Sequence, residues 1–387
     1  MRRLISRLPL FFYEEPFRIF FPAGLLLGII GVSLWPVYYG GWINVYPGTS
    51  HARLMIEGFM GSFIIGFLGT AGPRITSTSP FSRSAALTLL TLNLLAAGLN
   101  FGGANRGGDF LFAICIATLV GLIGRRFIRR KDSPPPNFAL VALGLVNGLI
   151  GAILLGLFEN LLYAKPYQLG AMLLEQGFVM LPILGIAPFL LPKLLNISLP
   201  DVPESRAFPS GWKGRAAFAV AAGLMVDFTF VLEAFRLTLF APWLRLGTIL
   251  IYLIVTMPSG TRSFLADCLR VGIGAIVIGI GCEALWPLYR VGALHITFIS
   301  GFSFVAMTVG IRVVFGHSGN AHLFKKRLPF FISAGALIFL AAFSRYVADL
   351  APAARTIHLV AAAICWLVAA LIWAIKVLPK VAIADPE

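Results

Sequence analysis

The chain has 387 residues, of which 58% are hydrophobic and only 12% charged. A water-soluble protein of this composition would lack the polar surface to stay dissolved, so the sequence predicts an integral membrane protein whose main partner is the lipid bilayer. The formal net charge of +15 does not indicate nucleic-acid binding, because Lys and Arg lie in short clusters between apolar segments, as in proteins oriented by anionic membranes.

A helix that crosses the bilayer needs about 20 mostly apolar residues, because its backbone polar groups must be satisfied within the segment. The sequence therefore predicts an all-α polytopic bundle of about twelve spans, with the fourth and eighth unusually short. In chain order the predicted spans are 17–37, 53–71, 85–103, 109–123, 138–161, 169–191, 216–235, 246–257, 271–288, 294–314, 329–347 and 357–377.

Basic residues occur at the two ends of the chain and in every second connection. They are Arg2, Arg3 and Arg7, Arg74 and Arg83, Arg125, Arg126, Arg129, Arg130 and Lys131, Lys193, Arg206, Lys213 and Arg215, Arg262 and Arg270, Lys325, Lys326 and Arg327, and Lys380. The positive-inside rule then predicts that both termini are cytoplasmic in a bacterial inner membrane.

The longest connection, 196–214, holds three prolines and divides a single membrane domain into two six-helix halves, about 1–195 and 215–387. No repeat relates the two halves, so an inverted-repeat transporter is not indicated.

The predicted topology sorts the histidines by membrane side. His51, His295 and His358 begin spans two, ten and twelve at the outer face, whereas His317 follows span ten on the cytoplasmic side. Histidines at one depth on separate helices are how a bundle builds a haem or copper site. A single histidine at a helix end is more often an interfacial or hydrogen-bonded residue than a ligand. The shared depth of the three makes the two interpretations about equal, so both stay open.

Charged residues inside the predicted spans form the second signal. Arg53 and Glu57 are four residues apart on span two, where an ion pair can form, and Asp227, Glu283 and Arg312 also lie within spans. Because a charge that faces lipid costs at least about 2.5 kcal/mol, we expect these groups to face the bundle interior. They are candidates for a polar cavity, a proton path or contacts to a cofactor.

Three motifs resemble those of the NnrS family. The sequence HARLMIEGF at 51–59, followed by GFLGTAGP at 66–73, is similar to the family's second-span signature. The segments LHITFISG at 294–301 and FGHSGN at 315–320 resemble its tenth-span signature, and PFR at 16–18 matches the opening of the family before span one. The twelve predicted spans and the order of the motifs also fit.

The resemblance implies a haem- and copper-containing inner-membrane protein that binds a small diatomic ligand such as nitric oxide and acts in nitric oxide metabolism or in protection against nitrosative stress. His51, His295 and His317 match histidines of the family motifs and are implied to bind the cofactor, with His51 and His295 as the implied metal ligands. The family's second histidine of span two is Arg53 here, and arginine does not ligate metal. The segment 264–270, FLADCLR, also lacks the usual histidine, so His358 is expected to replace or supplement a lost ligand.

Two other functions remain open. In a transporter or permease, Glu57, Asp227 and Glu283 would line a midplane cavity, and in a cofactor-free membrane sensor the histidines would be structural. The sequence shows no nucleophile elbow, P-loop, zincin helix or dinucleotide fingerprint, so it does not indicate a hydrolase or a nucleotide-driven pump.

Overall fold

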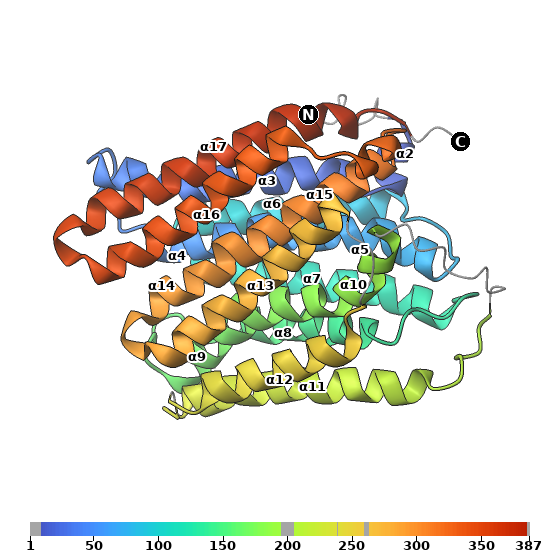
Figure 1. The fold of residues 1–387 in the computed structure, drawn as a ribbon, viewed down its shortest axis with the longest axis horizontal. Helices are drawn as coiled ribbons and strands as arrows, with labels where there is room; N and C mark the ends of the chain where they lie inside the picture. The colour runs from blue at the N-terminus through green and yellow to red at the C-terminus, as the bar shows by residue number, and fades with distance from the viewer. Residues whose placement is uncertain (1–8, 195–204, 238, 259–262, 385–387) are drawn as a thin grey trace.

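The structure is a computed structural model that describes residues 9–194, 205–237, 239–258 and 263–384. All regular elements in this part of the chain are helices, and eleven of them are long and apolar enough to cross a membrane. The predicted polytopic helical bundle is therefore confirmed (Figure 1). Arg2, Arg3, Arg7 and Arg262, and part of the 196–214 connection, lie outside the described residues.

The first half of the chain contributes six crossings. They are α3 (Phe17–Tyr39), the continuous helix α4 (Gly48–Arg53), η1 (Leu54–Met60) and α5 (Gly61–Ile75), then α6 (Arg83–Phe101), α7 (Asn105–Ile128), α8 (Phe138–Phe158), and the continuous helix α9 (Lys165–Met172), η2 (Leu173–Gly177) and α10 (Phe178–Leu194). A short helix, α2 (Phe11–Glu14), precedes them.

The second half follows the same pattern. Its helices are α11 (Trp212–Ala234), α12 (Ala241–Thr256), α13 (Phe264–Leu285), the connected η3 (Pro287–Tyr289), α14 (Arg290–His295), η4 (Ile296–Ser303) and α15 (Phe304–Gly316), then α16 (Pro329–Leu350) and α17 (Arg355–Val381), with short η5 (Ala321–Lys325) and η6 (Pro352–Ala354) in connections.

The predicted eighth span corresponds to α12, the shortest crossing. Its 16 residues extend about 24 Å, less than the roughly 30 Å of a bilayer's hydrocarbon core. The helix starts five residues before the predicted span and includes Arg245, whose side chain is fully buried. Arg245 is the fifth residue of this helix and contacts the buried carboxylates of Glu233 and Glu283, so its charge is paired inside the bundle.

Several helices extend beyond the predicted spans because polar residues continue them. The fourth span, predicted at 109–123, is the 24-residue helix Asn105–Ile128. The ninth, predicted at 271–288, begins at Phe264, where the Ser263 hydroxyl accepts a hydrogen bond from the backbone of Ala266. Hydropathy alone ends a span at its first charges, whereas a helix ends where its backbone is capped.

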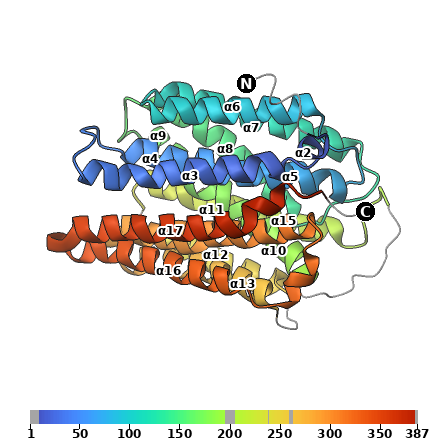
Figure 2. The same cartoon turned by 90° about the horizontal axis from the view of Figure 1, so that it is seen from above.

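Both described chain ends lie at one end of the bundle, which we call the terminal end. There the Arg18 guanidinium, one residue into α3, donates a hydrogen bond of 2.6 Å to the carbonyl of Val381, the last residue of α17. The opposite end, with Gly48, Lys165 and Arg355 at its helix starts, is called the distal end. From above, α3 and α17 lie side by side, with α6 and α7 on one flank and α13 and α16 on the other (Figure 2).

Small residues allow neighbouring helices to pack closely. Gly148 and Gly151 of α8 face the helix that contains η2, and a Cβ atom at Gly151 would lie 2.7 Å from the backbone nitrogen of Leu174. Backbones approach this closely only where side chains are absent, as is usual between membrane helices. The contact fixes the position of η2, which carries Glu175.

Three crossings contain a π-helical segment, namely η1, η2 and η4. π-helical turns are rare and are frequently found at functional sites. The segments belong to spans two, six and ten, which are far apart in sequence, and residues from all three line one cavity. The irregular helices therefore point to the same part of the bundle.

Candidate functional site

A cavity of about 510 Å³ lies in the distal half of the bundle, and we call it the distal cavity. This volume is within the roughly 300–1,000 Å³ typical of ligand and cofactor sites. Its polar lining includes His51, Glu175, His295, Arg345 and Arg355. Its aromatic lining consists of Trp35, Tyr39, Tyr46, Phe298, Phe302 and Trp366. The cavity thus combines an apolar body with a few nitrogen donors and cations.

His51 and His295 are oriented in the same way. Nδ1 of His51 lies 3.0 Å from the carbonyl oxygen of Gly31, and Nδ1 of His295 lies 2.7 Å from that of Val291. A carbonyl only accepts hydrogen bonds, so Nδ1 carries the proton in each neutral ring and Nε2 keeps its lone pair. This arrangement, a backbone carbonyl on one ring nitrogen and the other nitrogen available, is the usual preparation of a histidine for metal binding.

Aromatic neighbours hold both imidazoles in place. Trp35 meets the His51 ring edge-on at a centroid distance of 5.7 Å, and Phe298 meets His295 in the same manner at 5.8 Å. Phe298 lies one helical turn after His295 and contacts Phe302, one turn further, at 5.7 Å. An aromatic row therefore extends from His295 along one face of the tenth span to the inner end of the cavity.

The π-helical segment η1 explains how span two lines the cavity over several turns. Gly48, Ala52, Ile56 and Met60 all line it, at intervals of four residues. In an α-helix with 3.6 residues per turn, every fourth residue drifts by about 40° around the axis. The wider π turn reduces this drift, so residues on both sides of η1 face the same space.

Arg53 does not line the distal cavity but lies beside it in a buried cluster. Its Nε lies 2.6 Å from an oxygen of Asp109, its Nη1 lies 3.7 Å from Glu175, and its Nε lies 3.9 Å from Glu57. The predicted pair with Glu57 is thus the longest of three contacts. Asp109 is the main partner, which the sequence alone did not indicate because it belongs to another helix, 56 residues away.

Glu57 accepts its hydrogen bonds from α6. One carboxylate oxygen accepts a hydrogen bond of 2.7 Å from the amide of Asn100, and the backbone carbonyl accepts one of 2.9 Å from Asn93. Its other carboxylate oxygen, Oε1, is buried without a hydrogen-bond partner among the described residues. Glu57 therefore belongs with Arg53 and Asp109 in the first ionic cluster, which also includes Glu175.

A second ionic cluster contains two arginines and two glutamates, so its formal charges balance. Arg245 contacts both Glu233 and Glu283, the latter at 3.1 Å. Arg290 contacts the same two carboxylates from the other side, at 2.5 and 2.7 Å. Of these four, the sequence singled out only Glu283 as a site residue. Hydropathy does not indicate Arg245, because this residue precedes the apolar stretch of its helix.

The π-helical segment η2 joins the two clusters. Glu175 contacts Arg53 of the first cluster, and the next residue, Gln176, accepts a hydrogen bond of 3.3 Å from Arg245 of the second. Glu175 also lines the distal cavity. The two ionic clusters, one from each half of the chain, are thereby connected through a short segment at the cavity wall.

Asp227 and Arg312, two further predicted members of a polar cavity, lie elsewhere. Asp227 accepts a hydrogen bond of 2.6 Å from Asn147 between α11 and α8. Arg312 lies over the Phe324 ring near the terminal end, 4.2 Å from its centroid. Neither residue lines the distal cavity, and neither do Glu57 and Glu283. A transporter in which Glu57, Asp227 and Glu283 share one cavity is therefore not what the geometry favours.

His358 lies at the distal end but not in the lining of the distal cavity. The Ser344 hydroxyl lies 3.2 Å from its Nδ1 and donates a hydrogen bond of 2.9 Å to its backbone carbonyl, between α16 and α17. Arg355 and Leu359, on either side of His358 in sequence, do line the cavity. The structure brings His51 and His295 to one space and leaves His358 outside its lining.

His317 lies at the terminal end, roughly 30 Å of helix away from His295. Nδ1 of His317 lies 2.5 Å from Glu15, whose carboxylate also contacts Arg18 and Arg74. The backbone carbonyl of His317 accepts a hydrogen bond of 2.7 Å from Arg18. We call these four residues the terminal clasp. It joins two of the motif segments noted in the sequence, 16–18 and 315–320, and gives His317 a structural setting.

The clasp also determines the ionisation of Glu15. Burial by itself raises the pKa of this carboxyl, but the hydrogen bonds and charges of His317 and Arg18 outweigh that effect and hold the pKa below its ordinary value of 4.5. Glu15 is thus a carboxylate that connects α3, α5 and the end of α15.

Comparison with known proteins agrees with the motif evidence. The family model described as NnrS protein matches residues 11–382, and no curated protein matches the chain. The matched region covers all the described membrane-crossing helices, including the second and tenth spans that supply His51 and His295. The chain is therefore a multi-pass membrane protein that belongs to the NnrS family.

Proposed function

We propose that this protein lies in a bacterial inner membrane, binds haem in its distal cavity, and acts in nitric oxide metabolism or in protection against nitrosative stress. The observation that carries the proposal is the matched pair of His51 and His295, each with Nδ1 on a backbone carbonyl and Nε2 available in one cavity. Imidazole nitrogen is the commonest axial ligand of haem iron in proteins.

The rest of the cavity fits a haem group. An apolar, aromatic wall suits the macrocycle, and Arg345 and Arg355 supply cations for two propionate groups. Glu175 adds an acidic group that links the cavity to the buried ionic clusters. Bound haem would supply an iron centre able to take nitric oxide as a ligand and to exchange an electron.

Copper fits less fully. No group of three or more His, Cys, Asp or Glu residues that could hold a metal is found among the residues the structure describes. The distal cavity does contain the Met55 thioether together with His51 and His295, and a set of two imidazoles and a thioether suits copper(I). Metal analysis of the purified protein distinguishes the two occupants.

We further propose that the distal end faces the periplasm. The support is the distribution of cations along the chain, which places the basic connections at the terminal end. A nitric oxide molecule from outside the cell or from the bilayer would then reach the histidines without crossing the charged terminal end.

The test is one preparation in detergent, expressed with ample haem, with an optical spectrum and metal analysis. We expect a Soret band that shifts with nitric oxide and that is lost or altered in His51→Ala and in His295→Ala. His358→Ala and His322→Ala serve as matched controls, because His358 does not line the cavity and His322 is exposed in η5. A folded protein without a Soret band, or a band unchanged in both cavity variants, would refute the haem site.

A further inference from the structure

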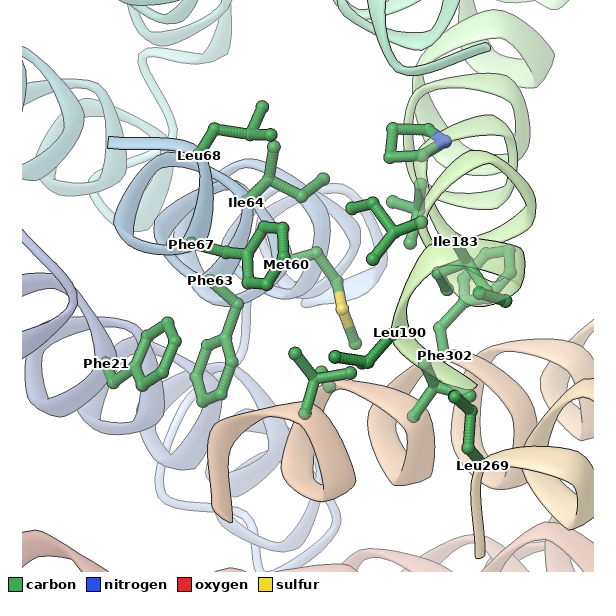
Figure 3. A pocket seen from close by; sticks show the side chains of 17 residues that line it. Phe21, Met60, Phe63, Ile64, Phe67, Leu68, Ile183, Leu190, Leu269 and Phe302 are labelled. Atoms are coloured by element: carbon green, nitrogen blue, oxygen red, sulfur yellow. The ribbon is translucent and has the colours of Figure 1, made fainter. Parts of the chain in front are cut away.

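A second, smaller cavity lies next to the distal cavity on its terminal side. Its volume is about 70 Å³, and all 17 side chains that line it are apolar (Figure 3). Phe21 and Phe63 stack on one side of it, Ile183 and Leu190 of α10 lie on another, and Leu269 of α13 completes the wall. We call this space the apolar chamber.

Only two residues, Met60 and Phe302, line both the apolar chamber and the distal cavity in the described part of the chain. Met60 is the last residue of η1 and Phe302 belongs to η4, so each half of the chain contributes one. Both side chains are buried. Met60 is unbranched and flexible, and Phe302 ends the aromatic row that begins at His295, so two side chains with rotatable bonds lie where the two spaces meet.

The lining determines which molecules the chamber accepts. A buried water needs two to four polar partners, and the chamber lining offers no polar side chain, so water is disfavoured. Ions are excluded for the same reason, because an unpaired charge cannot be moved into an apolar space. The volume is far below the roughly 300 Å³ at which pockets for larger organic ligands begin. What remains is a small, uncharged, weakly polar molecule.

We propose that the apolar chamber is a binding site for small uncharged gas molecules, with Met60 and Phe302 as the partition through which they exchange with the distal cavity. Dispersion contacts with the many apolar wall atoms supply the attraction, as in other dry cavities that take up xenon. Gas binding in the chamber does not depend on the proposed function. The delivery of gas from the chamber to His51 and His295 does rest on the proposed function.

The first experiment measures xenon binding to the cofactor-free protein in detergent, by xenon NMR and by structure determination under xenon pressure. We expect xenon in the chamber of the wild type, and at least a tenfold loss of that signal in Ile183→Phe and in Ala187→Phe, which fill the space. Ile254→Phe is the matched control, because Ile254 is 80% exposed on the outside of the bundle. Absence of xenon in the folded wild type, or equal binding in the filled variants, overturns the proposal.

The second experiment measures xenon exchange by saturation transfer in the same preparation. Phe302→Leu and Met60→Ala thin the partition and should raise the exchange rate several-fold, while Phe302→Trp should lower it. Exchange rates that are the same in all three variants would overturn the role of the partition. Xenon binding needs no cofactor, so a protein without a Soret band still gives a clear result for the chamber. If the chamber binds no xenon, the haem spectrum still tests the proposed function separately.

Discussion

The first ionic cluster allows a sharp prediction about the replacement of Arg53. In Arg53→Gln, the guanidinium that contacts Asp109, Glu57 and Glu175 is lost. Removal of one partner from a buried ion pair typically costs about 3–5 kcal/mol, because the remaining charge stays buried without compensation. The distances assign most of this cost to Asp109, whose oxygen is 2.6 Å from Nε, against 3.7 and 3.9 Å for the two glutamates.

A double-mutant cycle measures this assignment. We expect Arg53→Gln to lower the free energy of unfolding in mixed micelles by about 3–5 kcal/mol, and the addition of Asp109→Asn to recover at least half of that loss. Arg215→Gln is the control, since Arg215 is exposed at the terminal end, and it should change stability by less than about 0.5 kcal/mol. If the double variant is as unstable as the sum of the two single ones, Arg53 and Asp109 are not coupled and the reasoning is wrong.

Three further predictions concern the second ionic cluster, the terminal clasp and helix packing. Arg245→Gln should destabilise the protein by about 3–5 kcal/mol, and Arg290→Gln by clearly less. The reason is that the Arg245 side chain is fully buried, whereas that of Arg290 is 38% exposed and screened by solvent. Denaturant titration of both variants checks this order. The pKa of Glu15 is lowered in the folded state, so its contribution to stability is complete above its ordinary pKa of 4.5 and is lost as the pH falls through the folded value. Unfolding midpoints measured between pH 6 and pH 3 should therefore fall less steeply in Glu15→Gln than in the wild type. The same pH profile in both proteins would contradict the clasp. Gly151→Ala should lower the unfolding temperature, because the added Cβ atom would lie 2.7 Å from the backbone of η2. Gly121→Ala is the control and should be neutral or stabilising, because a Cβ atom there has no neighbour within 4 Å. Equal effects of the two substitutions would show that the close contact does not matter.

Membrane-crossing helices could be read from the sequence because the bilayer imposes a length and an apolar composition on each of them. Their ends could not, since Arg245 and the polar start of α13 belong to helices yet interrupt the hydropathy signal. The π-helical segments also left no recognisable pattern. They add a residue to a turn without changing the apolar composition, and their position depends on the helices packed around them.

The site shows the same division. Sequence spacing placed His51 and His295 at the start of two spans, and the structure puts both in the lining of the distal cavity. The sequence could not distinguish these two histidines from His358, because the packing of α16 and α17 determines which face of each helix points to the interior. Spacing also suggested Glu57 as the partner of Arg53, whereas Asp109 of α7 lies closer.

The sequence by itself determined that the chain is a polytopic helical membrane protein with the motifs of the NnrS family, because apolar composition, length and local motifs are properties of each segment. Only the tertiary structure decided which charges pair, that His317 belongs to the terminal clasp, and that the distal cavity and the apolar chamber meet at Met60 and Phe302. These features arise between segments far apart in sequence, such as Glu15 and His317, which are 302 residues apart, so they depend on helix packing, which no local pattern encodes.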